Sequence, residues 1–106
     1  NTNIMGADIE ELKQKIAPVA VKYELDKVIL FGSRARGDGN TNSDFDFYVE
    51  STAIKGLFKL GGLFADMESA VGNKVDIVIK PLAEHRHIKD YLLKSIQEDG
   101  VLLYAR

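Results

Sequence analysis

Two aspartates separated by one residue, Asp44 and Asp46, are the residues in this chain whose type and spacing most directly suggest chemistry. They alternate with Phe45, Phe47 and Val49, which predicts a β-strand with its apolar side chains on one face. Residues i and i+2 of a strand point to the same face, so the two carboxylates should lie side by side. Such carboxylates repel each other unless a cation lies between them, and Mg²⁺ is a hard cation that suits oxygen ligands of this kind.

A third aspartate, Asp76, is the only charged residue within the apolar run Val75–Ile79. A carboxylate in such a strand is costly if it is buried without a partner. If this strand pairs beside residues 44–49, Asp76 joins Asp44 and Asp46 in a group of three acids, enough to bridge two catalytic metal ions. Taken alone, the pair at 44 and 46 is more typical of the solvated face of an edge strand.

The second candidate site is a turn at Gly32 and Ser33, which follows the short apolar run Val28–Phe31. Glycine permits a tight turn whose backbone amides can face an anion, and the serine adds a hydroxyl donor. Arg34 and Arg36 add two guanidinium groups, which suit a polyphosphate. The loop lacks both Gly-x-Gly-x-x-Gly and Gly-Lys-Ser/Thr, which excludes a dinucleotide-binding or P-loop site. By itself, a glycine turn with surface arginines is the simpler explanation.

The elements that must position these residues alternate in periodicity along the chain. Apolar residues at steps of three and four predict helices, and short apolar or alternating runs predict strands. In the first helix Asp8 is a candidate N-cap and Pro18 should bend or divide the helix. The expected order is a helix over 8–23, a strand over 28–31, a loop over 32–43, a strand over 44–49, a helix over 54–71 that ends at Gly72, a strand over 75–79, a helix over 84–98 and a short strand over 101–104.

This order predicts a single α/β (α+β) domain over residues 8–106, a small mixed β-sheet with helices mainly on one face and the acids on the other; residues 1–7 should form a flexible N-terminus. Its 106 residues are 45% hydrophobic and 28% charged, enough for one ordinary core. The chain has no cysteine, which excludes disulfides and thiolate chemistry. The net charge of −2 argues against binding long nucleic acid. No apolar run is long enough to cross a membrane, and we expect a soluble cytoplasmic protein.

The two motifs together resemble the nucleotidyltransferase superfamily of the DNA polymerase β type. Gly32 and Ser33 are followed by ten residues, then by Asp44 and Asp46, and a strand with Asp76 comes about thirty residues later. The segments Gly-Ser-Arg-Ala-Arg-Gly and Ser-Asp-Phe-Asp-Phe are similar to the minimal branch, the MNT-domain proteins, and the resemblance extends over nearly the whole chain. It implies the nucleotidyltransferase fold.

The resemblance also implies a role for each matching residue. Gly32 and Ser33 match the turn that binds the β- and γ-phosphates of a nucleoside triphosphate, with Arg34 and Arg36 beside it. Asp44 and Asp46 match the pair that holds two Mg²⁺ ions, and Asp76 matches the third acid near the acceptor hydroxyl. Minimal relatives are commonly paired with a HEPN-type RNase toxin, and some inactivate it by transferring AMP from ATP to a tyrosine. We therefore expect an antitoxin enzyme in a hetero-oligomer with its toxin.

Two other functions stay open at this point. The chain could be an inert antitoxin that blocks its partner by binding alone, or it could transfer a nucleotide to a small molecule such as an aminoglycoside.

Among the remaining residues, His85 and His87 fit a solvated helix start, and Tyr48 fits packing beside the acids better than contact with a nucleotide. The segment Gly39–Asn42 is expected to be a flexible loop, and Lys80 could touch a phosphate.

Overall fold

The computed structural model describes residues 6–37, 44–80 and 90–106. The elements in these ranges are α1 (Gly6–Lys22), β1 (Lys27–Phe31), α2 (Ser33–Arg36), β2 (Phe45–Glu50), α3 (Gly56–Val71), β3 (Val75–Lys80), α4 (Asp90–Asp99) and β4 (Val101–Ala105). The predicted strands are all present, and their order along the chain is the expected one. The loop over 39–42, the two histidines and Pro81 lie outside the described residues.

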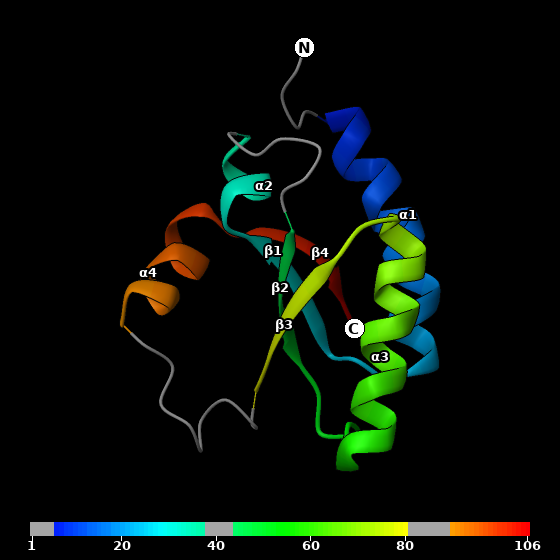
Figure 1. The fold of residues 1–106 in the computed structure, drawn as a ribbon. Coiled ribbons are helices and arrows are strands. Elements are labelled where there is room, and N and C mark those ends of the chain that lie inside the picture. The colour runs from blue at the N-terminus through cyan, green and yellow to red at the C-terminus, as the bar shows by residue number, and fades with distance from the viewer. Residues whose placement is uncertain (1–5, 38–43, 81–89) are drawn as a thin grey trace.

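The four strands form one mixed sheet in the order β3-β2-β1-β4. The central strand β1 is antiparallel to both β2 and β4, whereas β2 and β3 are parallel. Helix α3 connects the two parallel strands and lies against the sheet beside α1 (Figure 1). Helix α4 lies on the other side of the sheet, near β1 (Figure 1). The predicted mixed sheet, with helices mainly on one face, is confirmed.

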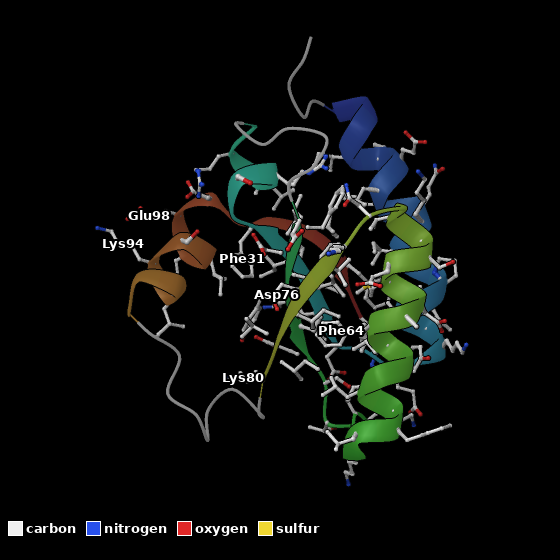
Figure 2. The ribbon with its side chains drawn as sticks, viewed as in Figure 1. Phe31, Phe64, Asp76, Lys80, Lys94 and Glu98 are labelled. Atoms are coloured by element: carbon white, nitrogen blue, oxygen red, sulfur yellow. The ribbon has the colours of Figure 1, made fainter. Side chains whose placement is uncertain are left out.

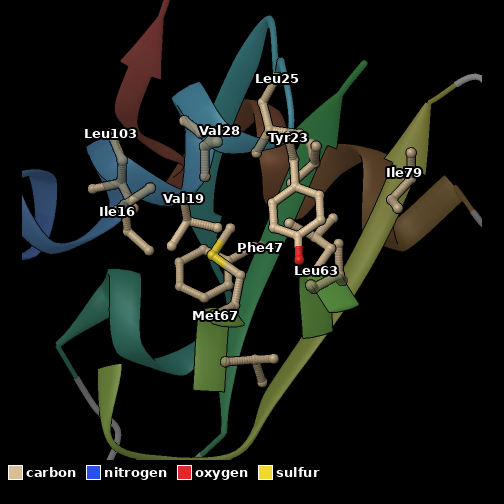
Figure 3. Close-up of a cluster of buried hydrophobic side chains, with 14 of the residues drawn as sticks. Ile16, Val19, Tyr23, Leu25, Val28, Phe47, Leu63, Met67, Ile79 and Leu103 are labelled. Atoms are coloured by element: carbon tan, nitrogen blue, oxygen red, sulfur yellow. The ribbon is translucent and has the colours of Figure 1, made fainter. Parts of the chain in front are cut away.

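The main hydrophobic core lies between α1, α3 and the sheet (Figure 3). The alternation predicted for β2 holds, because Phe47 and Val49 are fully buried on the core face while Tyr48 belongs to a second cluster on the opposite face. Helix α1 contributes residues at steps of three and four, as expected for an amphipathic helix. Its buried core residues are Leu12, Ile16, Val19 and Ala20.

One expectation for α1 is wrong, and for Pro18 the structure excludes division of the helix, one of the two effects expected there. The helix begins at Gly6, so Asp8 lies within its first turn and is not the N-cap. The helix is also continuous through Pro18, which does not divide it. Proline in a helix interior removes one backbone hydrogen bond and costs about 3 kcal/mol. Burial of the apolar stripe on both sides of Pro18 offsets that cost.

Helix α3 differs from the expectation at its first turn. Its C-terminal stop is confirmed, because Gly72 is left-handed and its N–H donates to the Glu68 carbonyl at 2.8 Å. Leu57 and Phe58 share the helical spacing of the apolar residues within the helix predicted over 54–71, but they are 85% and 98% exposed. The buried stripe of this helix instead begins further along, with Leu63 and Met67. Periodicity alone could not locate where the helix leaves the sheet.

The glycine pair within α3 has two different environments. An added Cβ at Gly62 would lie 2.7 Å from the Tyr23 hydroxyl oxygen, so glycine allows the tyrosine to approach the helix. That hydroxyl donates to Asp66 at 2.9 Å, and Lys22 pairs with the same carboxylate oxygen at 2.7 Å. An added Cβ at Gly61 would meet no atom within 4 Å. The α1–α3 packing therefore requires a glycine at position 62 only.

We predict opposite effects for alanine at these two neighbouring positions. Gly61→Ala should stabilise the protein by about 1 kcal/mol, because alanine favours the helix and meets open space. Gly62→Ala should destabilise it by about 1 kcal/mol, because the methyl group displaces Tyr23 from Asp66 and overpacks the contact. Urea unfolding of both variants measures the difference. Equal stabilisation by both would show that the Tyr23 contact does not constrain the helix.

Candidate functional site

The three predicted acids lie on one face of the sheet, at the end where β2 and β3 begin. The parallel register pairs Asp46 directly with Asp76, which confirms that the two strands are neighbours. Asp44 immediately precedes β2 and is exposed. Figure 2 shows Asp76 and Phe31 on the α4 side of the sheet, whereas Phe64 lies on the α3 side. The acid face is therefore opposite the main core.

Asp46 is the most constrained of these carboxylates. Its pKa is raised above the usual range, first because the side chain is partly buried and then because the negative charges of Asp76 and Asp44 lie nearby. The positive charge of Arg36 acts in the opposite direction but is the smaller influence. A group in this position favours a neighbouring cation or a proton. The repulsion inferred from the strand pattern is thus present in the folded protein.

The glycine turn directly contacts the acid site. Gly32 has φ of 80° and ψ of −159°, a backbone conformation that is essentially restricted to glycine. A Cβ at this position would collide with Oδ2 of Asp46. The register of β1 against β2 explains why Gly32 lies so close to Asp46, because Phe31, the last residue of β1, pairs with Asp46. Two motifs that are separated in sequence thus form one site.

A one-turn helix, α2, follows the glycine, within a segment for which the sequence predicted only a loop. Its hydrogen bonds run from the N–H groups of Ala35 and Arg36 to the Gly32 carbonyl, both at 3.1 Å. The first N–H groups of a helical turn have no acceptor within that turn. Ser33, the first residue of α2, is half-buried beside Gly32. A stretch of four residues is too short for periodicity to predict.

The two arginines of α2 lie in different surroundings. The guanidinium of Arg34 lies 4.3 Å from the ring centre of Phe45, an aromatic residue on the core face of β2. Arg36 pairs with Asp99 at the end of α4 at 3.6 Å, and its charge acts on Asp46. The sequence assigned both arginines to a phosphate site. The structure brings Arg36 toward the acids and places Arg34 against Phe45.

A small apolar cluster adjoins the acids. Phe31, Tyr48 and Ile96 are buried together under α4, with Ile29 and Val78 packed against them. The Tyr48 hydroxyl donates to Glu50 at 2.9 Å, so its role in packing is confirmed. Lys80 shares this face but lies four residues beyond Asp76, about 13 Å along the strand. Figure 2 shows it at the far end of β3.

The chemistry of the acids fits a hard divalent cation. All three offer carboxylate oxygens, and a cation beside Asp46 would relieve the repulsion that raises its pKa. Within residues 6–37, 44–80 and 90–106, no three side chains of the His, Cys, Asp or Glu type are close enough to form a metal-binding group. The acids are therefore linked by strand register and by charge, and do not form a preassembled set of three ligands.

Comparison with known proteins now gives the family. The family model "Polymerase beta, Nucleotidyltransferase" matches residues 14–106. The chain belongs to this nucleotidyltransferase family, as the glycine turn and the paired aspartates predicted. A Methanocaldococcus jannaschii relative named "Putative protein adenylyltransferase MJ0435" is 33% identical over 87 residues, covering 78% of this chain and 94% of that protein. Protein adenylyltransferase MntA of Aphanizomenon flos-aquae is 28% identical over 109 residues, and the match covers 92% of this chain and 67% of that protein.

Solved structures confirm the fold. A chain of a toxin–antitoxin complex with AMP-PNP has a TM-score of 0.68 at 24% identity, covering 89% of this chain and 73% of that one. A chain of the Shewanella oneidensis complex between a tri-AMPylated HEPN toxin and its MNT antitoxin has a TM-score of 0.64 at 20% identity, covering 92% and 73%. In the present chain, none of the helices over the described ranges is long and apolar enough to span a membrane.

Asp99 and Ile96 of α4 are site residues that sequence reasoning missed. Ile96 lies within the helix predicted over 84–98, but helical spacing does not show that its side chain covers Phe31 and Tyr48. Asp99 belongs to no recognisable sequence motif. Its pairing with Arg36 joins the end of α4 to α2, two segments that are far apart in the sequence. The signal that could have located both is topological. The last helix precedes β4, which pairs with β1 and so brings α4 close to the glycine turn.

We predict opposite stability changes when two aspartates are replaced by asparagine. Asp46→Asn should raise the Tm of the metal-free protein, because it removes a charge that burial and the neighbouring carboxylates disfavour. Asp66→Asn should destabilise it, because hydrogen bonds from Lys22 and Tyr23 hold the pKa of Asp66 below its usual value. Thermal melts at pH 7 without divalent cations measure both.

The pH dependence separates these effects further. The Asp46→Asn advantage should shrink as the pH falls through the raised pKa of Asp46, because protonation then removes the same charge from the wild type. The Asp66→Asn deficit should also shrink in acid, because the stabilising carboxylate of Asp66 is lost as it protonates. If Asp46→Asn lowers Tm at pH 7, the repulsion among the acids does not control stability.

Proposed function

We propose that this chain transfers AMP from ATP to a hydroxyl group, a tyrosine, of a HEPN-type partner protein, and thereby acts as an antitoxin. The observation that carries the proposal is the contact between the glycine turn and Asp46, with Asp76 paired to Asp46 on the next strand. A phosphate-binding turn and an acid cluster are the two parts that nucleotidyl transfer requires, and here they adjoin.

Each residue has a role that follows from its position. The backbone at Gly32 and the Ser33 hydroxyl would hold the β- and γ-phosphates, which become the leaving pyrophosphate. Arg36 is the better placed arginine to balance the pyrophosphate charge, because it already acts on Asp46. Arg34, stacked on Phe45, would keep the start of β2 in position.

The acids would bind the cation and accept the proton. Asp44 and Asp46 would hold Mg²⁺, two ions in the full complex, and the bound metal would stabilise charge that develops at the α-phosphate. Asp76, paired with Asp46 but more exposed, is the carboxylate that can reach an incoming hydroxyl. It would accept the hydroxyl proton as that oxygen attacks the α-phosphorus and pyrophosphate departs.

The comparisons support the identities of the nucleotide and the partner. One relative is named a protein adenylyltransferase, and one similar fold was solved in a toxin–antitoxin complex with AMP-PNP. Another similar fold occurs in a complex whose HEPN toxin bears AMP.

The test is transfer of label from α-³²P-ATP to a purified candidate HEPN-type protein in the presence of Mg²⁺. We expect labelled partner, with AMP on tyrosine by mass spectrometry, and loss of label with EDTA or with Asp44→Asn and Asp46→Asn together. Label on an aminoglycoside but not on the protein would favour the small-molecule enzyme. A stable complex with no label under any condition would favour the inert binding module.

Asp76→Asn distinguishes a catalytic acid from a strand residue. We expect transfer to fall by about 10²–10⁴-fold because the proton acceptor is lost. ATP affinity should change by less than about threefold, because the glycine turn, Asp44 and Asp46 remain. Single-turnover labelling and equilibrium binding of a fluorescent ATP analogue measure the two quantities. Asp26→Asn is the matched control, because Asp26 immediately precedes β1 at the end of the sheet opposite the acids, where it pairs with Arg106. Normal transfer by Asp76→Asn would remove Asp76 from the site.

A further inference from the structure

The first turn of α3 forms an exposed apolar surface that the nucleotide site does not use. Leu57 is 85% exposed and Phe58 is 98% exposed, the two largest exposures among the exposed large apolar side chains that the structure describes. They border an open groove of about 680 Å³, lined by Tyr23, Leu57, Phe58, Lys59, Gly61 and Gly62. An aromatic side chain in water at this level of exposure contributes nothing to the stability of the folded chain.

Gly61 gives this groove a second, independent feature. Glycine within a helix costs about 1 kcal/mol relative to alanine, and neighbouring Gly62 has a structural reason in Tyr23. Gly61 has none, because an added Cβ would meet open space. The absent side chain instead leaves the groove open at that point. The costs of Gly61 and Phe58 to the isolated chain are both explained if another molecule occupies the groove.

The charges around the groove indicate the chemistry of that molecule. Lys55 and Lys59 are exposed at the start of α3, and its first turn contains no acidic residue. The nearest carboxylate on the helix, Asp66, is already bound by Lys22 and Tyr23. The helix dipole adds positive potential at the same end. An occupant with apolar side chains flanked by carboxylates would complement both the groove and its rim.

A second copy of this chain is the wrong occupant. A two-fold contact places the same patch on both subunits, so the lysine rim of one protomer would face the lysine rim of the other. The groove is also remote from the acid site. Helix α3 covers the face opposite Asp46 and Asp76, and its first turn follows the end of β2 whereas the acids lie at the beginning (Figures 1 and 2).

We propose that this groove docks an amphipathic helix of a partner protein, with apolar side chains contacting Phe58 and Gly61 and carboxylates contacting Lys55 and Lys59. Amphipathic helices bind apolar grooves through side chains at helical spacing, and a few buried aromatic contacts dominate the affinity. Docking here holds the partner without covering the nucleotide site. The two surfaces can therefore be altered separately.

The test uses two labelled synthetic peptides and the whole chain without nucleotide. Both peptides are amphipathic helices with leucine and phenylalanine on one face; one has glutamates beside that face and the other has lysines. Fluorescence anisotropy should show binding of the glutamate peptide, and Phe58→Ser and Gly61→Met should each weaken it at least tenfold. Leu102→Ser, which alters an exposed leucine on β4, should leave it unchanged. Lys55→Glu with Lys59→Glu should reverse the peptide preference.

Three results of the peptide assay would overturn the proposal. These are absence of binding to the glutamate peptide, equal binding of both peptides, and binding that Phe58→Ser does not reduce. Sedimentation equilibrium tests whether a second copy of the chain occupies the groove. A wild-type dimer that Phe58→Ser dissociates would assign the groove to that second copy and overturn the proposal. Circular dichroism verifies the folding of each variant, and Phe58→Ser keeps the test decisive if Gly61→Met fails to fold, because the Phe58 side chain is almost wholly exposed.

Discussion

The contact between Gly32 and Asp46 is the constraint on which the candidate site depends. The carboxylate occupies the space where any other residue at position 32 would place its Cβ, and the glycine backbone adopts a conformation that other residues avoid. Because Phe31 pairs with Asp46, the register of β1 and β2 sets this contact. The glycine turn and the carboxylate to which we assign phosphate and metal binding are consequently held together by the hydrogen bonds of the sheet.

Much of the scaffold could be predicted because its strands have simple patterns. The alternation around Asp44 and Asp46, and the lone charge within 75–79, identified both the strands and the face that carries the acids. The roles of Arg34 and Arg36 could not be separated in the same way. Two residues apart on one helical turn, their side chains diverge, and the packing of Phe45 and Asp99 decides where each guanidinium lies. Such contacts join distant segments and leave no local signal.

The sheet separates two kinds of surface. One face is covered by α1 and α3 and contains nearly all of the buried apolar residues, so it supplies most of the stability. The other face has a smaller apolar cluster beneath α4 and keeps mutually repelling carboxylates beside it. Helix α3 contributes to the first face along its middle and leaves it at its first turn, where the apolar side chains point into solvent.

The parallel pairing of β2 with β3 also limits how this chain can change over evolution. Side chains alternate between faces, so inserting or deleting one residue before Asp76 within β3 would move its carboxylate to the core side of the sheet. Residues 51–55, which join β2 to α3, lie between elements, but Ser51 and Ile54 are buried there and Ser51 bonds to the end of β3. Lineages of this protein should therefore keep the length of the segment from Val75 to Asp76 and the two buried positions of that connection.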